Sequence, residues 1–118
     1  MPSNNIFHRY LPMTETMYYI LLSLTEPRHG YGILLHVKHI TAGRVELGAG
    51  TIYNSLAKLE ADDLIALTAE TERRRIYAAT KLGCSLLKRE LERLKELSKN
   101  GMLYLTETII QTKGCGPT

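Results

Sequence analysis

Residues 48–82 read GAGTIYNSLAKLEADDLIALTAETERRRIYAATKL, and the spacing of the apolar residues changes within this stretch. From Ile52 to Leu59 the apolar residues recur at helical spacing, which predicts a helix over about 49–62. Two short extended runs follow, and the polar segment between them holds Arg73, Arg74 and Arg75. This pattern predicts a helix followed by a two-stranded hairpin with a basic tip.

Two shorter helices are predicted upstream of this stretch. Thr14 suits an N-cap, and the apolar residues after it recur at helical spacing until Pro27 stops the helix. A second helix is predicted from about Gly30 to Thr41, followed by a short extended segment over 44–47. Residues 1–12 are predicted to form an arm with at most one helical turn.

A long amphipathic helix is predicted downstream, with Thr80 as its N-cap. Its leucines lie at helical spacing, and the apolar stripe continues past Asn100-Gly101, where an internal glycine costs about 1 kcal/mol. We therefore expect this helix to reach about Thr112, with residues 113–118 as a tail. The predicted division is residues 1–79 for the domain and 80–112 for the helix.

The element order predicts a mainly α fold, a winged helix-turn-helix domain with a long C-terminal dimerisation helix. A helix of about 30 residues would be about 45 Å long, and a domain this small cannot cover it. We therefore expect its far end to pack against a second copy of the chain. The predicted dimer-interface residues are Leu87, Leu91, Leu94, Met102 and Leu105.

In such a fold the third helix enters the major groove of double-stranded DNA, and the hairpin contacts the backbone. Small residues at the start of this helix allow close approach to a phosphate, and its outer face offers polar side chains, among them Ser55. The predicted DNA-binding residues are Tyr31, Gly50, Thr51, Tyr53, Asn54, Lys58, Arg73, Arg74 and Arg75.

A series of short motifs falls on these elements in order. They are His29-Gly30-Tyr31-Gly32, Gly50-Thr51-Ile52-Tyr53, Leu56-Ala57-Lys58-Leu59-Glu60, Leu64-Ile65, Arg73-Arg74-Arg75-Ile76-Tyr77 and Thr80-Lys81-Leu82-Gly83. Over roughly residues 11–97, the series resembles the PadR family of bacterial transcriptional regulators. The resemblance implies a homodimeric repressor, dimerised through the long C-terminal helix with help from the first helix, and a short subfamily with a single C-terminal helix.

The resemblance also implies a response to small aromatic or hydrophobic compounds. The residues that we predict to line an effector pocket between subunits are Met17, Tyr18, Leu94 and Tyr104. Ordinary packing of the same side chains is the alternative interpretation. No cofactor is predicted.

Composition limits the other classes of function. The chain has 118 residues, 44% hydrophobic and 23% charged, with net charge +3, which fits one globular domain and permits nucleic acid as a partner. No apolar run is long enough to cross a membrane, and no signal-peptide pattern is present. Because Cys84 and Cys115 lie far apart, we expect a cytoplasmic protein without a disulfide framework.

Three other classes of function fit the sequence less well. An enzyme is disfavoured because no nucleophile–base or ligand cluster occurs at a suitable spacing. A winged helix that binds protein instead of DNA would need an acidic or apolar third helix, and this one is polar. His29, His36 and His39 could hold a metal ion in a metal sensor, but no cysteine or acidic residue joins them locally, so no metal site is predicted.

Overall fold

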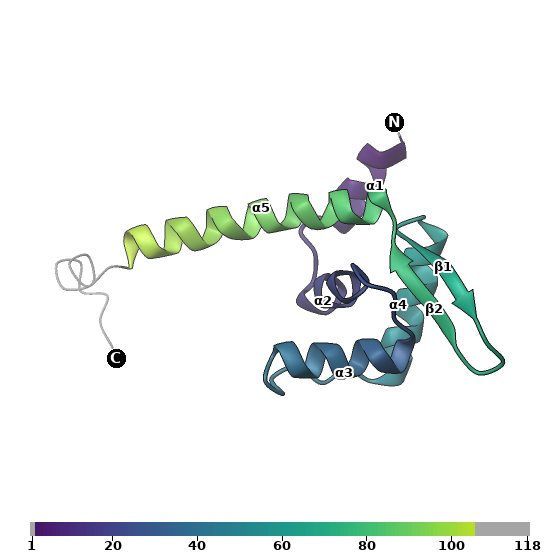
Figure 1. Ribbon diagram of the computed structural model, residues 1–118. Coiled ribbons are helices and arrows are strands. Elements are labelled where there is room, and N and C mark those ends of the chain that lie inside the picture. Colours follow the sequence, from purple (N-terminus) through teal and green to yellow (C-terminus); the bar gives the residue numbers. More distant parts are fainter. Residues whose placement is uncertain (1, 106–118) are drawn as a thin grey trace.

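The structure, a computed structural model, describes residues 2–105 and has, after an additional N-terminal helix, the predicted order of elements (Figure 1). The chain forms α1 (Pro2–Tyr10), α2 (Glu15–Ser23), α3 (Gly30–Ile40), α4 (Ala49–Ala61), β1 (Ile65–Glu70), β2 (Arg75–Ala79) and α5 (Lys81–Tyr104). The prediction of a mainly helical winged helix-turn-helix fold with a long C-terminal helix is confirmed.

Side-chain caps start three of the helices. The hydroxyl of Thr14 accepts a hydrogen bond from the backbone N–H of Met17 at 3.1 Å, and the hydroxyl of Thr80 accepts one from Gly83 at 3.1 Å. Both caps were predicted, and each satisfies a backbone donor that the first helical turn leaves free. α3 is capped by a histidine instead, because Nδ1 of His29 accepts from Gly32 N–H at 3.0 Å.

The core lies where α2, α3 and α4 meet the hairpin and the start of α5. The apolar face predicted for the helix over about 49–62, which is α4, is confirmed, since its inward side chains are almost fully buried. The fully buried apolar residues include Ile20, Leu21, Leu24, Ile33, Val37, Ile52, Leu59, Leu64, Ile65 and Leu86. α4 is therefore packed against the core on one side and exposed on the other.

Backbone hydrogen bonds tie the hairpin to the helical domain. β1 and β2 pair antiparallel from Ile65↔Ala79 to Glu70↔Arg75, with an irregularity between Leu67 and Ala69. The segment before α3 adds a bridge, because Arg28 and Tyr77 exchange two backbone hydrogen bonds of 3.0 and 2.9 Å. The orientation of the hairpin relative to α3 is fixed by this bridge.

The start of the chain corrects one prediction. Residues 2–10 form the helix α1 instead of an arm with a single turn. Its last residue, Tyr10, is buried, and the Tyr10 hydroxyl donates a hydrogen bond of 2.8 Å to Asp62 at the end of α4. Arg9 pairs with the same carboxylate at 3.0 Å. These contacts join residues far apart in the sequence, which is why local pattern did not reveal the helix.

Other boundaries differ by a few residues from those predicted. The helix after Thr14 ends at Ser23, with Leu24 as its C-cap, before Pro27 is reached. Residues 44–47 form no strand.

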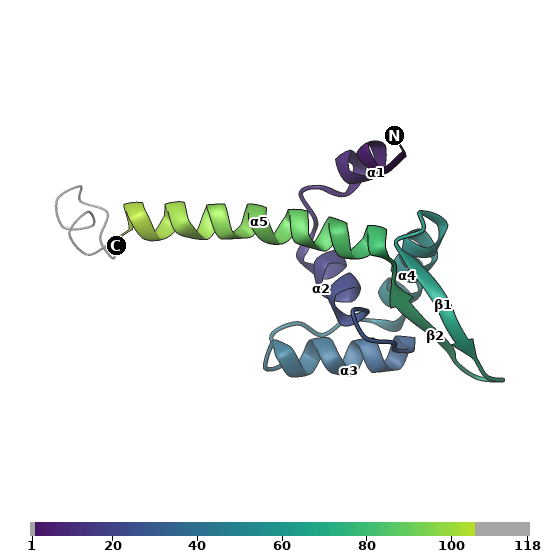
Figure 2. The same cartoon turned by 45° about the horizontal axis from the view of Figure 1, so that its top comes forward.

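The last helix passes through Asn100-Gly101, as predicted, and is described as far as Tyr104. Residues 106–112 and the predicted tail at 113–118, with Cys115, lie outside the described residues. In both views α5 runs from the hairpin past α2 and then away from the domain (Figures 1 and 2). The distal half of this helix is therefore not covered by the other described elements.

No helix among residues 2–105 is both long enough and apolar enough to span a lipid bilayer.

Candidate nucleic-acid interface

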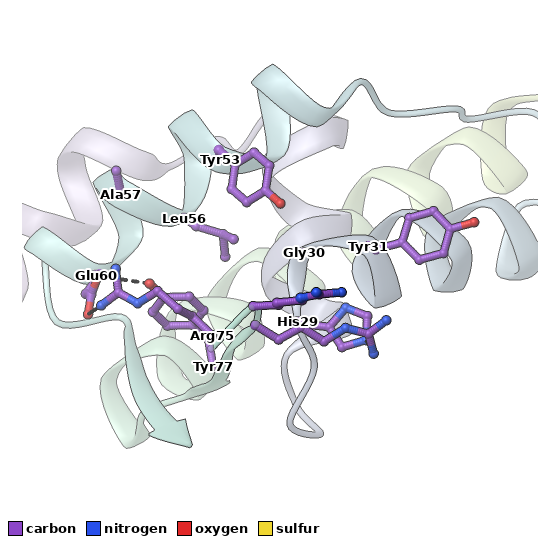
Figure 3. A pocket seen from close by; sticks show the side chains of 11 residues that line it. His29, Gly30, Tyr31, Tyr53, Leu56, Ala57, Glu60, Arg75 and Tyr77 are labelled. Atoms are coloured by element: carbon purple, nitrogen blue, oxygen red, sulfur yellow. Dashed lines mark hydrogen bonds and ion pairs between the residues drawn. The ribbon is translucent and has the colours of Figure 1, made fainter. Parts of the chain in front are cut away.

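A groove of about 410 Å³ opens between α3, α4 and the hairpin (Figure 3). It is lined by His29, Gly30, Tyr31, Tyr53, Leu56, Ala57, Glu60, Arg73, Arg74, Arg75 and Tyr77. The groove therefore brings together two predicted sets, the tyrosines of the helices and the arginines of the hairpin.

The outer face of α4 is exposed along its length. Thr51, Asn54 and Lys58 are exposed, as is Gly50 in the first turn, where an added Cβ would meet nothing within 4 Å. Ser55 was predicted on this face, but its side chain is buried, because it shares the inward stripe of Ile52 and Leu59. The exposed face offers hydroxyl, amide and ammonium groups, which can hydrogen-bond to base edges and phosphates.

Two tyrosines project from the helices that border the groove (Figure 3). Tyr31 is 59% exposed and Tyr53 is 62% exposed, although large aromatic side chains usually bury more of their surface. The Tyr53 ring lies over the start of α3, since a Cβ on Gly30 would be 3.4 Å from its Cε1 atom. The glycine between His29 and Tyr31 thus leaves room for an aromatic side chain of the next helix.

The three hairpin arginines have different surroundings. Arg75 is engaged within the protein, because its guanidinium lies 4.0 Å from Glu60, 3.7 Å from Glu70 and 5.6 Å from the centre of the Tyr77 ring. Within residues 2–105, no acidic side chain lies within ion-pair distance of Arg73 or Arg74.

The electrostatics of the groove follow from these pairings. Glu60 is the acidic residue in its lining, and it also faces the Tyr77 hydroxyl at 3.4 Å. Burial and the Glu60 charge raise the pKa of Tyr77, which therefore stays neutral and donates to that carboxylate. With Glu60 opposite Arg75, the groove keeps an excess of positive charge from Arg73 and Arg74.

Lys58, like Gly50, Thr51 and Asn54, is a predicted contact that does not line the groove. Its ammonium group lies 5.0 Å from the centre of the Tyr10 ring, on the side of α4 that faces α1. Lys58 and the hairpin arginines therefore border the exposed face of α4 on different sides.

The predicted effector pocket is only partly assembled in a single chain. A cavity of about 330 Å³ between α2 and α5 is lined by Met13, Glu15, Tyr18, Tyr19, Glu90, Arg93 and Leu94. Tyr18 and Leu94 were predicted to line it, whereas Met17 and Tyr104 do not. Tyr104 is 64% exposed at the end of α5, too far along the helix to reach this cavity.

An acidic residue in this cavity was missed by the sequence analysis. Glu90 is buried, and the guanidinium of Arg93 donates to both of its carboxylate oxygens at 2.8 and 2.7 Å. That hydrogen-bonded pair holds the pKa of Glu90 below its usual range despite burial. In the sequence, the signal for this ion pair was the spacing of three residues, which brings two side chains to the same face of a helix.

One predicted dimer-interface residue belongs to the core of its own subunit. Leu87 is buried where α5 crosses the domain, so it is not available to a partner. Leu94 is half-buried beside the cavity, while Leu91, Met102 and Leu105 are 41%, 73% and 59% exposed. The exposed part of the predicted interface thus runs from Leu91 to Leu105.

Two of the three histidines considered as metal ligands, His29 and His36, have separate partners. His29 caps α3, while Nδ1 of His36 lies 2.9 Å from the hydroxyl of Ser23 in the core. Within residues 2–105, no three His, Cys, Asp or Glu side chains cluster in a way that could hold a metal ion.

Similar proteins are found both by sequence and by fold. An uncharacterised 37.1 kDa protein of transposon TN4556 from Streptomyces fradiae is 36% identical over 80 residues, which is 67% of this chain but 23% of that protein. A transcriptional regulator from Clostridium thermocellum shares the fold, with a TM-score of 0.67 at 23% identity over 86% of this chain and 96% of that chain.

Bacillus subtilis PadR, solved in complex with operator DNA, superposes with a TM-score of 0.58 at 26% identity. That match covers 68% of this chain and 48% of that chain. The sequence pattern described as "Transcriptional regulator PadR-like family" matches residues 19–89, more than half of the chain. The chain therefore belongs to the PadR-like family of transcriptional regulators.

Proposed function

We propose that this chain is a homodimeric repressor that binds a palindromic DNA operator through α4 and the hairpin. The observation that carries the proposal is the groove at which exposed tyrosines of α3 and α4 meet Arg73 and Arg74, which pair with no acidic side chain within residues 2–105. The complex of Bacillus subtilis PadR with operator DNA supports this use of the fold.

The two parts of the interface have different roles in this proposal. α4 lies in the major groove, where Asn54 and Thr51 can hydrogen-bond to base edges and Tyr53 can contact bases or sugars. Arg73 and Arg74 lie over the neighbouring phosphates, which fix the position of the domain but carry no sequence information themselves. Sequence preference then depends on α4, and much of the affinity depends on the hairpin.

Dimerisation follows from the uncovered part of α5. The helix has 24 residues, so it is about 36 Å long, and only its first half packs on the domain. The exposed side chains Leu91, Met102 and Leu105 fall along one stripe, which a second copy related by two-fold symmetry would bury. Two copies of α4 would then read half-sites one or two helical turns apart.

The DNA-binding proposal is tested by fluorescence anisotropy with a labelled mixed-sequence duplex over a series of salt concentrations. Arg73→Ala and Arg74→Ala should each weaken binding and reduce the slope of log affinity against log salt by about 0.9, the value of one lost phosphate contact. Lys99→Ala, at an exposed position on α5 away from the groove, serves as the charge-matched control. Equal slopes for all four proteins would contradict the assigned interface.

The dimer is tested by light scattering. The wild type should show about twice the chain mass of 13.3 kDa, and Met102→Glu should reduce the measured mass toward that of one chain. A wild-type protein of single-chain mass at micromolar concentration would contradict the proposed assembly. Repression itself is tested with a reporter gene placed behind an operator selected from random DNA sequences.

An effector site is proposed for the cavity between α2 and α5. A small aromatic or hydrophobic compound that fits one spacing of the two domains better would shift the dimer toward that spacing and release DNA. The probe is an anilinonaphthalene sulfonate dye, whose fluorescence should rise with the wild type and less with Leu94→Glu. Equal fluorescence with both proteins would argue against this cavity.

A further inference from the structure

His29 lies between two hydrogen-bond donors at the edge of the groove. Its Nδ1 atom is 3.0 Å from the backbone nitrogen of Gly32, and its Nε2 atom is 3.0 Å from Nη1 of Arg74. The backbone N–H and the guanidinium can only donate. A neutral imidazole has one nitrogen that accepts and one that carries hydrogen, so it cannot accept from both donors at once.

The contact with Gly32 is the one that forms a hydrogen bond. It satisfies a donor in the first turn of α3 that has no partner within the helix. Arg74 is exposed at the tip of the hairpin and can be solvated by water instead. Nδ1 of His29 is therefore the acceptor, Nε2 carries the hydrogen, and this N–H faces the N–H of Arg74.

With Nε2 carrying the hydrogen, the two groups cannot hydrogen-bond to each other, but both can donate to one acceptor that lies beside them. The acidic residue that lines the groove does not supply one, because Glu60 is directed toward Arg75 and the Tyr77 hydroxyl. An acceptor from outside the chain can bridge them, and an anionic oxygen suits this place best because no acidic side chain within residues 2–105 pairs with Arg74.

We propose that Nε2–H of His29 and the guanidinium of Arg74 together bind one non-bridging phosphate oxygen of the DNA backbone. The inference rests on the proposed DNA-binding function and adds a contact residue from the turn before α3. It gives His29 two roles: the cap fixes the ring, and the fixed ring presents Nε2–H beside the arginine. It also explains why an imidazole suits the cap, since the usual capping side chains have no second donor at that distance.

The first test needs no DNA. Nitrogen-15 NMR of the histidine rings distinguishes the two neutral tautomers, and His29 is assigned by comparison with His29→Asn. At a pH where the ring is neutral, we expect the tautomer with hydrogen on Nε2. The opposite tautomer would overturn the inference and would leave the proposed DNA-binding function untouched.

The second test measures affinity for the mixed-sequence duplex at low salt. His29→Asn keeps a capping acceptor for Gly32 N–H but removes the distal donor, so its thermal midpoint should stay close to that of the wild type. Because a hydrogen bond to a charged oxygen is lost, we expect binding about tenfold weaker. His8→Asn is the matched control, since His8 is exposed on α1, away from the groove.

The double variant His29→Asn/Arg74→Ala separates a shared phosphate from two independent contacts. If both groups hold one oxygen, the loss in the double variant should be smaller than the product of the two single losses. Wild-type affinity in His29→Asn, together with weaker binding in Arg74→Ala, would overturn the inference alone. Wild-type affinity in both single variants, or no DNA binding by the wild type, would overturn the proposed interface as well.

Discussion

Gly83 lies where α5 packs closely against the backbone of Leu64, and Gly83→Ala is the substitution that tests this contact. A Cβ at this position would be 2.2 Å from the carbonyl oxygen of Leu64 and 3.2 Å from its carbonyl carbon. The carbonyl cannot simply turn away, because it accepts a hydrogen bond of 3.0 Å from the Thr80 backbone. The Thr80 hydroxyl also donates a hydrogen bond of 2.7 Å to the backbone carbonyl oxygen of Asp63.

The size of the effect follows from three contributions. Relief of the overlap requires α5 and the Leu64 backbone to separate by about 1 Å, and such overpacking costs typically about 1–3 kcal/mol. Weakening the Thr80–Leu64 hydrogen bond adds about 1 kcal/mol, and the higher helix propensity of alanine returns about 1 kcal/mol. We therefore expect Gly83→Ala to lower the free energy of unfolding by about 2 kcal/mol.

Urea denaturation followed by circular dichroism measures this change at fixed protein concentration, so that any dimer contributes equally to each variant. Gly50→Ala is the control, because an added Cβ there meets nothing within 4 Å and stability should stay the same or rise. If Gly83→Ala were as stable as the wild type, the close approach of α5 to the Leu64 carbonyl would be wrong.

Three smaller predictions concern caps and buried polar groups. Thr14→Ala should cost about 1 kcal/mol of unfolding free energy in urea, because the Met17 N–H loses its acceptor. Tyr10→Phe should cost a similar amount, about 1 kcal/mol, by removing the hydrogen bond to Asp62, and an unchanged urea midpoint would contradict that contact. Burial, and then the Arg28 charge, lower the pKa of His36, so the unfolded chain takes up this proton first as the pH falls. The thermal midpoint should therefore fall as the pH drops below about 6.5. His36→Gln should make the thermal midpoint less dependent on pH. An equal pH dependence in both proteins would exclude this histidine as its source.

Helix starts and the hairpin were predictable because their signals are local. Thr14 and Thr80 precede apolar residues at helical spacing, and each hydroxyl reaches a backbone donor three residues later. The change of period after Leu59 predicted the hairpin, because a strand and a helix need different spacings to bury one face. The predicted exposure of Tyr53 and the arginines then followed from their places on these elements.

Features that depend on distant residues were not predictable from the pattern. α1 is held by the hydrogen bond between Tyr10 and Asp62, and three helices, α2, α3 and α4, separate these two residues in the sequence. Leu87 was placed at the dimer interface because its spacing matches the exposed leucines, but α5 crosses the domain at that point and buries it. Periodicity identifies the apolar side of a helix, and only packing decides which residues on that side remain uncovered.

The connection between the hairpin and α5 determines how any change in the proposed dimer could affect DNA binding. β2 ends at Ala79, whose N–H donates to Leu24 at 2.7 Å, and α5 begins two residues later. Earlier in β2, Tyr77 is paired with Arg28 just before α3. With β2 held at Tyr77 and at Ala79 in this way, the hairpin, α3 and the start of α5 should move as one body. A compound bound between α2 and α5 would then act by changing the distance and angle between two intact domains, while each groove keeps its geometry. Such a compound should weaken binding to a two-half-site operator much more than binding to a single half-site.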